Sequence, residues 1–298
     1  MVLRCGSRTL DLTHPVVMGV LNVTPDSFSD GGRFVDTAAA VEHALRMVQE
    51  GAAIIDVGGE STRPGASAID AGNEIRRVVP VIEKLRAQTD VVISVDTSKP
   101  QVMRAAAAAG AELINDVRAL SEPGALEAAV ATPCAVCLMH MQGNPQSMQL
   151  APHYDDVVNE VRAFLQERVD VCGSAGLAPD RLVVDPGFGF GKTLEHNLQL
   201  LRHLDRLVVR RSPAPRSPSA EGFPGTALPI MVGLSRKSTV GQLTGRPAGE
   251  RVYGSIALAV IAMLNGARIV RAHDVGATVD ALKTVIAVRQ GARAASEG

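Results

Sequence analysis

Residues 91–110 read VVISVDTSKPQVMRAAAAAG, a short apolar run followed by a segment of helical spacing that stops on a glycine. The β-branched residues at the start predict a strand over 91–96. Apolar side chains then recur three and four residues apart over 101–110, as on one face of a helix, and the last glycine suits a helix C-cap. The stretch is therefore one strand-helix unit.

The same unit recurs along the chain. Further strands are predicted at 16–23, 53–57, 112–116, 135–140, 181–185, 228–234 and 267–273, and clear helices at 37–51, 155–173 and 255–266. Eight such units in series, with strands buried on both faces, are typical of a parallel barrel. We expect an α/β fold with a single (β/α)8 TIM barrel over residues 1–298, and a doubly wound open sheet is the alternative.

Two segments stand outside this count. Residues 2–12 suggest a short strand pair, so 1–14 is predicted to be an N-terminal β hairpin that plugs the bottom of the barrel. Residues 210–226 are rich in Pro, Ser and Arg, which predicts a flexible insertion between the sixth helix and the seventh strand. That connection lies on the face opposite a barrel's active site. We expect a tolerated insertion there, with a partner-binding arm as the alternative.

Composition excludes several classes of partner. The 298 residues carry a formal net charge of −1, so no global basic field attracts nucleic acid or an anionic membrane. Tryptophan is absent and aromatic residues make up 3%, which argues against base-stacking platforms. The N-terminus lacks the apolar run of a signal peptide, and the apolar run 256–264 is far shorter than the roughly 20 residues of a membrane span. We expect a soluble, cytoplasmic protein.

The four cysteines are expected to be structural. Cys134 and Cys137 form a C-x-x-C, but they lie inside an apolar stretch and no second Cys/His pair stands at zinc spacing. Free cysteine packs as a small hydrophobe, so we interpret these two, with Cys5 and Cys172, as buried thiols. A redox motif is the alternative.

The stretch DPGFGFGKT (185–193) resembles a phosphate-binding loop but departs from it at one position. The G-x-x-x-x-G-K-[ST] pattern needs a glycine at residue 186, and Pro186 stands there. Proline has no backbone N–H to give to a phosphate. A nucleotide hydrolase is therefore not favoured, and Lys192 and Thr193 are expected to begin the sixth helix.

Polar residues gather at the predicted strand ends. In a TIM barrel these ends converge on one mouth, where active sites are built. A capping role explains any single one of them, because strand-to-helix loops often begin with an N-cap residue. It explains the full set poorly: Asn22, Asp56, Glu60, Asp96, Asn115, Asp116, Met139, His140, Asp185, Ser235, Arg236, Lys237, Ser238, Arg271 and His273.

The chemistry of these side chains predicts two subsites. Asp96, Asn115 and Asp185 suit a planar ring that bears N–H donors and a carbonyl. An anion site would draw on Arg63, Lys237, Arg271 and His273, with Asn22 as an oxygen ligand for Mg²⁺. No catalytic nucleophile stands out. The loops 22–32 and 58–67 are interpreted as lids or substrate clamps over the mouth.

Eight stretches of the chain resemble the dihydropteroate synthase family, and the resemblance is very specific. They cover nearly the whole predicted barrel in the family's order: NVTPDSFSDGG (22–32), IIDVGGESTRPGA (54–66), ISVDTSKP (93–100), LINDV (113–117), MHMQGNPQSMQ (139–149), DPGFGFGK (185–192), GLSRKS (233–238) and RAHDV (271–275). The segment 210–226 departs from the family by being longer than the usual form, and it puts no site residue in doubt.

The resemblance implies an activity in folate biosynthesis. The family condenses 6-hydroxymethyl-7,8-dihydropterin pyrophosphate with p-aminobenzoate to give 7,8-dihydropteroate and pyrophosphate. Pyrophosphate leaves first in an SN1-like step, and the arylamine then attacks a pterin cation. The family uses Mg²⁺, is inhibited by sulfonamides and is usually a homodimer.

The resemblance also implies roles for individual residues. It assigns catalysis to Asp96, Asp185, Lys237 and Arg271. The pterin would contact Asp96, Asn115, Met139, Asp185, Phe190, Gly233, Lys237 and Arg271. Pyrophosphate would contact Asn22, Thr62, Arg63, Arg271 and His273, with Asn22 also on Mg²⁺. p-Aminobenzoate would lie among Phe28, Thr62, Arg63, Pro64, Lys237 and Ser238.

Two alternatives remain open at this point. A pterin-binding methyltransferase that uses methyltetrahydrofolate and a corrinoid would share the barrel and the Asp and Asn residues. It has no use for the STRPG (61–65) and SRKS (235–238) motifs, which are present here. A non-catalytic paralogue would be expected to have lost strand-end residues, and the chain retains them.

Overall fold

The computed structural model describes residues 1–24, 33–60, 69–143, 148–210 and 227–290. Eight parallel strands close into a barrel in the order β10-β3-β4-β5-β6-β7-β8-β9. They are β3 Val16–Asn22, β4 Ile54–Gly58, β5 Val92–Asp96, β6 Leu113–Asp116, β7 Ala135–Met139, β8 Leu182–Asp185, β9 Ile230–Gly233 and β10 Ala267–Ala272. The predicted barrel is confirmed, and the open sheet is wrong.

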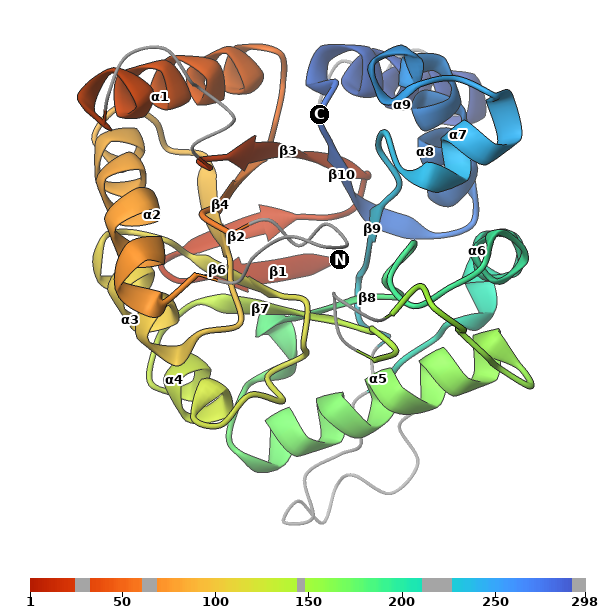
Figure 1. Cartoon of the computed structure of the whole chain (residues 1–298), viewed down its shortest axis with the longest axis horizontal. Coiled ribbons are helices and arrows are strands. Elements are labelled where there is room, and N and C mark those ends of the chain that lie inside the picture. The colour runs from red at the N-terminus through yellow and green to blue at the C-terminus, as the bar shows by residue number, and fades with distance from the viewer. Residues whose placement is uncertain (25–32, 61–68, 144–147, 211–226, 291–298) are drawn as a thin grey trace.

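Helices surround the barrel and cover the outer face of its strands (Figure 1). They are α1 Arg33–Gln49, α2 Ala71–Arg86, α3 Pro100–Ala108, α4 Ala125–Val130, α5 Val157–Ser174, α6 Leu194–Arg202, α7 Ser238–Thr244, α8 Val252–Leu264 and α9 Val275–Gln290. Asp70 and Asp156 cap α2 and α5 through their carboxylates, and Thr193 caps α6. The main hydrophobic core lies between this helical layer and the strands.

An antiparallel hairpin of β1 (Val2–Cys5) and β2 (Arg8–Asp11) precedes the barrel. In Figure 1 its two strands cross the centre of the ring of helices. The fully buried side chains of Leu3, Cys5 and Leu12 pack on inward-facing residues near the strand beginnings, among them Met18 and Ile54. The hairpin therefore fills the end of the barrel opposite the mouth, as predicted.

Charged side chains fix the hairpin to the barrel floor. Glu112, which precedes β6, accepts a hydrogen bond of 2.5 Å from Arg8 Nη1 and one of 2.9 Å from Arg86 Nη1. Arg8 also donates to Asp90 at 3.0 Å. Strand β6 and helix α2 are thus tied to β2 by one shared carboxylate.

Two other expectations concern the surface and the cysteines. Arg210 pairs with Ala227 in an isolated antiparallel bridge, so the ends of the predicted insertion lie side by side; residues 211–226 fall outside the described ranges.

All four cysteines are buried and free, which confirms their structural interpretation. Within the part of the chain that the structure describes, no helix combines the length and the apolar character needed to cross a membrane.

The hairpin should contribute measurably to stability. We expect Leu3→Ala to lower the free energy of unfolding by about 2–5 kcal/mol, because it leaves a cavity in a closed apolar layer. The adjacent Val2 is 52% exposed and serves as the matched control, for which Val2→Ala should change that energy by less than about 0.5 kcal/mol. Urea denaturation followed by circular dichroism measures both. Equal effects of the two changes would show that the hairpin does not act as a plug.

Candidate active site at the barrel mouth

Strand register places the predicted residues in one row. Asn22, Gly58, Asp96 and Asn115 are successive partners across β3, β4, β5 and β6. On the other side of the barrel, Met139 is paired with Asp185, and Gly233 with Arg271. Because all of these strands run parallel, their carboxyl ends deliver the side chains to the same mouth.

A partly buried guanidinium links three strands at the centre of this mouth. Arg271 Nε donates to Asp56 Oδ2 at 2.6 Å, and its Nη2 donates to Asp96 Oδ2 at 2.9 Å. Asp56 Oδ2 also accepts from Asn115 Nδ2 at 3.0 Å, and its other oxygen accepts from Ser94 Oγ at 2.6 Å. Strand β10 is therefore cross-linked to β4 and β5 by ionic hydrogen bonds.

Asp56 is a site residue that the sequence interpretation did not assign. The sequence places it at the end of the second strand, but β4 continues to Gly58, so Asp56 lies two residues before the strand end and is fully buried. The available signal was a carboxylate inside the apolar strand IIDVG. Such a charge is rarely buried without a partner. Its partner Arg271 is 215 residues away, so no local pattern identifies it.

The hydrogen bonds to Asp56 decide what the site offers to a ligand. Asn115 uses its amide nitrogen on Asp56, which leaves its amide oxygen as an acceptor. Asp96 Oδ1 is buried and has no hydrogen-bond partner within the described ranges. An unpaired buried acceptor is costly, and a ligand with N–H donors would relieve that cost.

Burial controls the charges of these groups. It raises the pKa of Asp96, against the opposing effect of Arg271, with further increases from Asp56 and Glu74. It also raises the pKa of Asp185, where Lys237 acts in the opposite direction. Burial alone would lower the pKa of Arg271, but the carboxylates of Asp56 and Asp96 outweigh it and the net direction is upward. The site thus holds anions and cations that compensate one another.

The stretch after β8 turns sharply to bring Phe190 to the site. Gly187 has φ +69°, and a Cβ there would lie 1.8 Å from the carbonyl oxygen of His140, so only glycine fits. Its N–H donates to Asp185 Oδ1 at 2.7 Å. Thr193 caps α6 with a capping box, which confirms that 192–193 lead into this helix.

Lys237 reaches the same region from the N-cap position of α7, just after β9. Its Nζ lies 4.5 Å from the centroid of the Phe190 ring and donates to the carbonyl of Phe188. Burial lowers the pKa of Lys237 to about 8, with Asp185 opposing. A Cβ at Gly233 would lie 3.9 Å from Lys237 Nζ and 4.0 Å from Arg271 Cβ, so this glycine keeps the space between the two cations open.

The predicted anion and p-aminobenzoate residues are described only in part. A Cβ at Gly58 would lie 3.8 Å from Asn22 Oδ1 and 3.8 Å from Asp96 Oδ2, so Asn22 borders the carboxylate row. His273 Nδ1 lies 3.1 Å from Ser235 Oγ, and Ser238 begins α7. Phe28, Thr62, Arg63 and Pro64 fall outside the described ranges. Within those ranges no three His, Cys, Asp or Glu residues are grouped to hold a metal.

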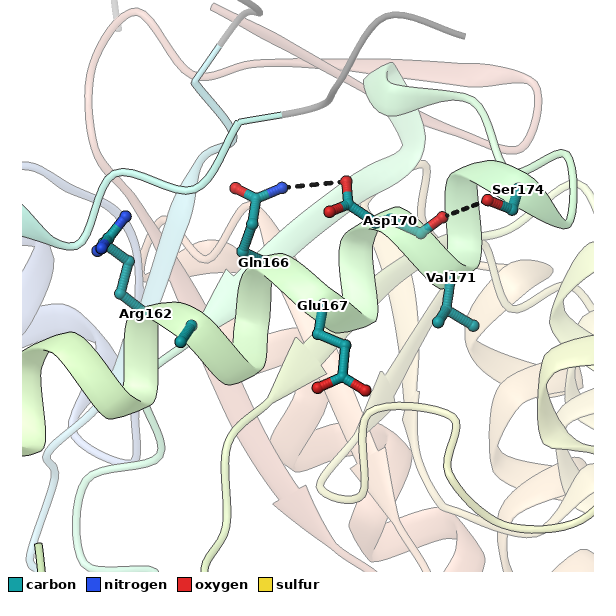
Figure 2. A pocket seen from close by; sticks show the side chains of 7 residues that line it. Arg162, Gln166, Glu167, Asp170, Val171 and Ser174 are labelled. Carbon is teal, nitrogen blue, oxygen red and sulfur yellow. Dashed lines mark hydrogen bonds between the residues drawn. The ribbon is translucent and has the colours of Figure 1, made fainter. Parts of the chain in front are cut away.

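A surface hollow lies away from the mouth, along helix α5. It is lined by seven residues of that helix between Arg162 and Ser174 (Figure 2). Gln166 Nε2 donates to Asp170 Oδ1 at 3.1 Å, and Ser174 Oγ donates to the Asp170 carbonyl at 2.9 Å (Figure 2). Gln166 also exchanges hydrogen bonds with the backbone of Arg210, so these polar groups are already paired and the hollow lacks the convergence of charges that marks the barrel mouth.

Comparison with known proteins agrees with this geometry. Residues 18–273 match the family model described as pterin binding enzyme. The dihydropteroate synthase of Escherichia coli K12 is 53% identical over 285 residues, which cover 96% of this chain and 95% of that protein. This chain belongs to the dihydropteroate synthases. The synthase of Haemophilus influenzae is 48% identical over 283 residues, covering 95% of this chain and 97% of its own length.

Solved structures of dihydropteroate synthases share the fold. The Yersinia pestis enzyme, in a sulfonamide drug complex, is 52% identical with a TM-score of 0.86, covering 97% of this chain and 99% of its own. The Xanthomonas albilineans enzyme with 4-aminobenzoic acid is 52% identical with a TM-score of 0.86, covering 97% and 98%. The Burkholderia cenocepacia enzyme complexed with 7,8-dihydropteroate is 46% identical with a TM-score of 0.86, covering 98% of each. The resemblance to this family seen in the sequence is confirmed.

Asp56 should matter for folding as well as for ligand geometry. We expect Asp56→Ala to lower the free energy of unfolding by about 3–5 kcal/mol, because it removes a fully buried carboxylate and leaves the partly buried Arg271 guanidinium with half of its counter-charge. The control is Asp180→Ala, which breaks an ion pair between Asp180 and Arg4 whose side chains are 51% and 44% exposed, and it should change stability little. Chemical denaturation compares the two. Similar losses in both variants would contradict a central role for Asp56.

Proposed function

We propose that this dihydropteroate synthase binds the pterin ring of 6-hydroxymethyl-7,8-dihydropterin pyrophosphate at the carboxylate row and joins it to p-aminobenzoate. The observation that carries the proposal is the buried, unpartnered Oδ1 of Asp96 beside Asn115. Asp96, Asn115 and Asp185 would accept or share hydrogen bonds with the ring edges. Met139, Phe190 and Gly233 would border the ring, with Lys237 at its edge and Arg271 over its face.

Electrostatics would supply most of the catalysis. As pyrophosphate leaves, positive charge develops on the pterin, and the carboxylates of Asp96 and Asp185 would stabilise it at short range. Arg63, Arg271 and His273, with Thr62, would bind the departing pyrophosphate. The arylamine of p-aminobenzoate then attacks the pterin methylene carbon in an SN1-like reaction. No protein nucleophile is required.

The donor chemistry of Asn22 fits a role on Mg²⁺. Its amide oxygen borders Asp96, and Mg²⁺ prefers oxygen ligands, commonly one or two from protein with the rest from substrate phosphate and water. Bound Mg²⁺ would neutralise charge on the pyrophosphate. p-Aminobenzoate would then lie among Phe28, Thr62, Arg63, Pro64, Lys237 and Ser238, near the start of α7.

A homodimer in the cytoplasm completes the proposal. Helix α8 is apolar around much of its circumference, and Tyr253, Ile261 and Leu264 on it are exposed, as is Val288 on α9. Exposed apolar side chains can mark interaction surfaces where they gather. A second copy of the chain would cover them. The composition, with a net charge of −1, favours no nucleic-acid or membrane partner.

A coupled assay for pyrophosphate release tests the function. With pterin pyrophosphate and Mg²⁺ present, we expect release to depend on p-aminobenzoate. Asp185→Ala should weaken pterin binding by about 2–4 kcal/mol in calorimetry, because ring donors lose a charged acceptor. The exposed Asp155→Ala serves as the control and should bind like the unaltered chain. Release that ignores p-aminobenzoate would point to a different acceptor.

The segment 210–226 is proposed to have no catalytic role. Because Arg210 and Ala227 are already paired, an Asn-Gly turn can replace 211–226 without moving either end. We expect kcat/KM for both substrates to stay within about twofold of the full chain, since the strand ends at the mouth are untouched. Steady-state kinetics measures this. A large fall in kcat/KM would show that the segment does more than connect α6 to β9.

A further inference from the structure

Lys192 is a buried ammonium, and its hydrogen-bond partners among the described residues are all neutral. Its Nζ lies 3.0 Å from the carbonyl oxygen of Gly187, 3.0 Å from that of Phe190 and 2.9 Å from His140 Nδ1. The residue is only 3% exposed. A buried cation without a directly bonded carboxylate is costly. A hydrophobic side chain would fill the same volume without that cost, so the charge itself calls for an explanation.

The two carbonyls belong to the turn that builds the pterin site. Gly187, Gly189 and Gly191 have φ of +69°, +78° and +62°, conformations that suit glycine. They allow residues 187–190 to curl so that two carbonyls converge on the ammonium that follows them in the chain. In the same turn, the Gly187 N–H donates a hydrogen bond to the Asp185 carboxylate, and the Phe190 ring lies beneath the ammonium of Lys237.

Other side chains hold this turn by single neutral hydrogen bonds. Tyr154 donates its hydroxyl to the Gly191 carbonyl at 2.8 Å, and Asn197 Oδ1 accepts from the Gly189 N–H at 2.7 Å. These bonds fix the shape of the turn without adding charge. Lys192 differs from them because it brings a positive charge to the inner side of the turn.

That charge acts on Asp185. Burial raises the pKa of Asp185, while Lys237, the Gly187 N–H, Lys192 and Arg271 all lower it. Burial lowers the pKa of Lys192 itself to about 7, with Asp185 opposing and Lys237 adding to the decrease. Burial and Lys192 together lower the pKa of His140 to about 3, so its neutral imidazole accepts through Nδ1. On α6, His196 also has a lowered pKa, from burial and then from Lys192.

We propose that Lys192 is a positioning residue for the pterin, which closes the 187–190 turn around its ammonium and, while protonated, supplies a positive charge beside Gly187, whose N–H donates to the Asp185 carboxylate. Lys192 does not touch the substrate in this arrangement. It acts through Asp185, whose ionised form accepts from the ring, and through Phe190, whose place depends on the turn. This inference rests on the proposed function, because it assumes that Asp185 binds the pterin.

The test measures the affinity for 6-hydroxymethyl-7,8-dihydropterin pyrophosphate between pH 5 and 8 by calorimetry. In the unaltered chain, affinity should fall as pH falls through the pKa of Asp185. Lys192→Met removes one of the charges that lower this pKa, so the loss should begin at a higher pH. We expect affinity near pH 7 to fall at least about tenfold, the size of a lost charge-assisted interaction.

Two further variants separate charge from turn shape. Tyr154→Phe removes one hydrogen bond from the same turn without changing charge, so the pH midpoint should stay that of the unaltered chain. Lys192→Arg keeps the charge and should restore the midpoint even if the affinity stays low. An equal shift of the midpoint in Tyr154→Phe, or no shift in a folded Lys192→Met, would overturn the inference.

A last variant covers the case in which Lys192→Met does not fold. His140→Leu removes one of the three acceptors of the Lys192 ammonium and keeps Lys192 itself. The pKa of Lys192 should therefore fall. As pH is raised, pterin affinity should begin to decrease at a lower pH than in the unaltered chain. An unchanged alkaline profile in His140→Leu would also overturn the inference. If the unaltered chain bound no pterin at any pH, the proposed function would fail instead, which keeps the two failures distinguishable.

Discussion

The structure depends on the pairing of the Arg271 guanidinium with the carboxylates of Asp56 and Asp96. This pairing joins β10, which closes the barrel against β3, to β4 and β5 across the mouth. The two ionic hydrogen bonds fix the orientation of the guanidinium plane. Asp56 also fixes the orientation of the Asn115 amide, because it accepts from Asn115 Nδ2. Asp96, Asn115 and Arg271, which a pterin is proposed to meet, are therefore already oriented before binding. Such preorganisation reduces the ordering cost of binding.

This arrangement costs stability when no ligand is present. The folded-state pKa values of Asp96 and Asp185 lie above the ordinary range because of burial. A carboxyl group with a raised pKa favours folding in its protonated form, so its ionisation weakens folding as pH rises from the unfolded pKa to the folded one. The apolar layers offset this cost, including the hairpin on the barrel floor. A ligand with N–H donors would reduce it directly, because it would pair the acceptors that burial leaves unsatisfied.

Local pattern predicted the barrel well, and its failures share one physical cause. β-Branched runs and glycine stops located all eight strands, with errors of one or two residues at their ends. The strand predicted at 181–185 begins one residue later, because Arg181 instead ends a short 3-10 turn and donates to the carbonyl of Cys134. The sequence assigns Asp56 no binding or catalytic role, because its partner Arg271 lies on the last strand. Contacts between distant residues leave no periodic trace in the sequence, whereas strand and helix formation does.

The GKT of residues 191–193 shows how similar loop sequences can bind ions of opposite charge. A phosphate-binding loop directs backbone N–H groups inward, so its centre attracts an anion. Here Pro186 lacks an N–H, and the glycines at positive φ let the carbonyls of Gly187 and Phe190 converge instead. Carbonyl oxygens attract a cation, and the cation is the chain's own Lys192. The lysine that would bind phosphate in a nucleotide hydrolase is thus enclosed by the loop, and its charge lowers the pKa of Asp185.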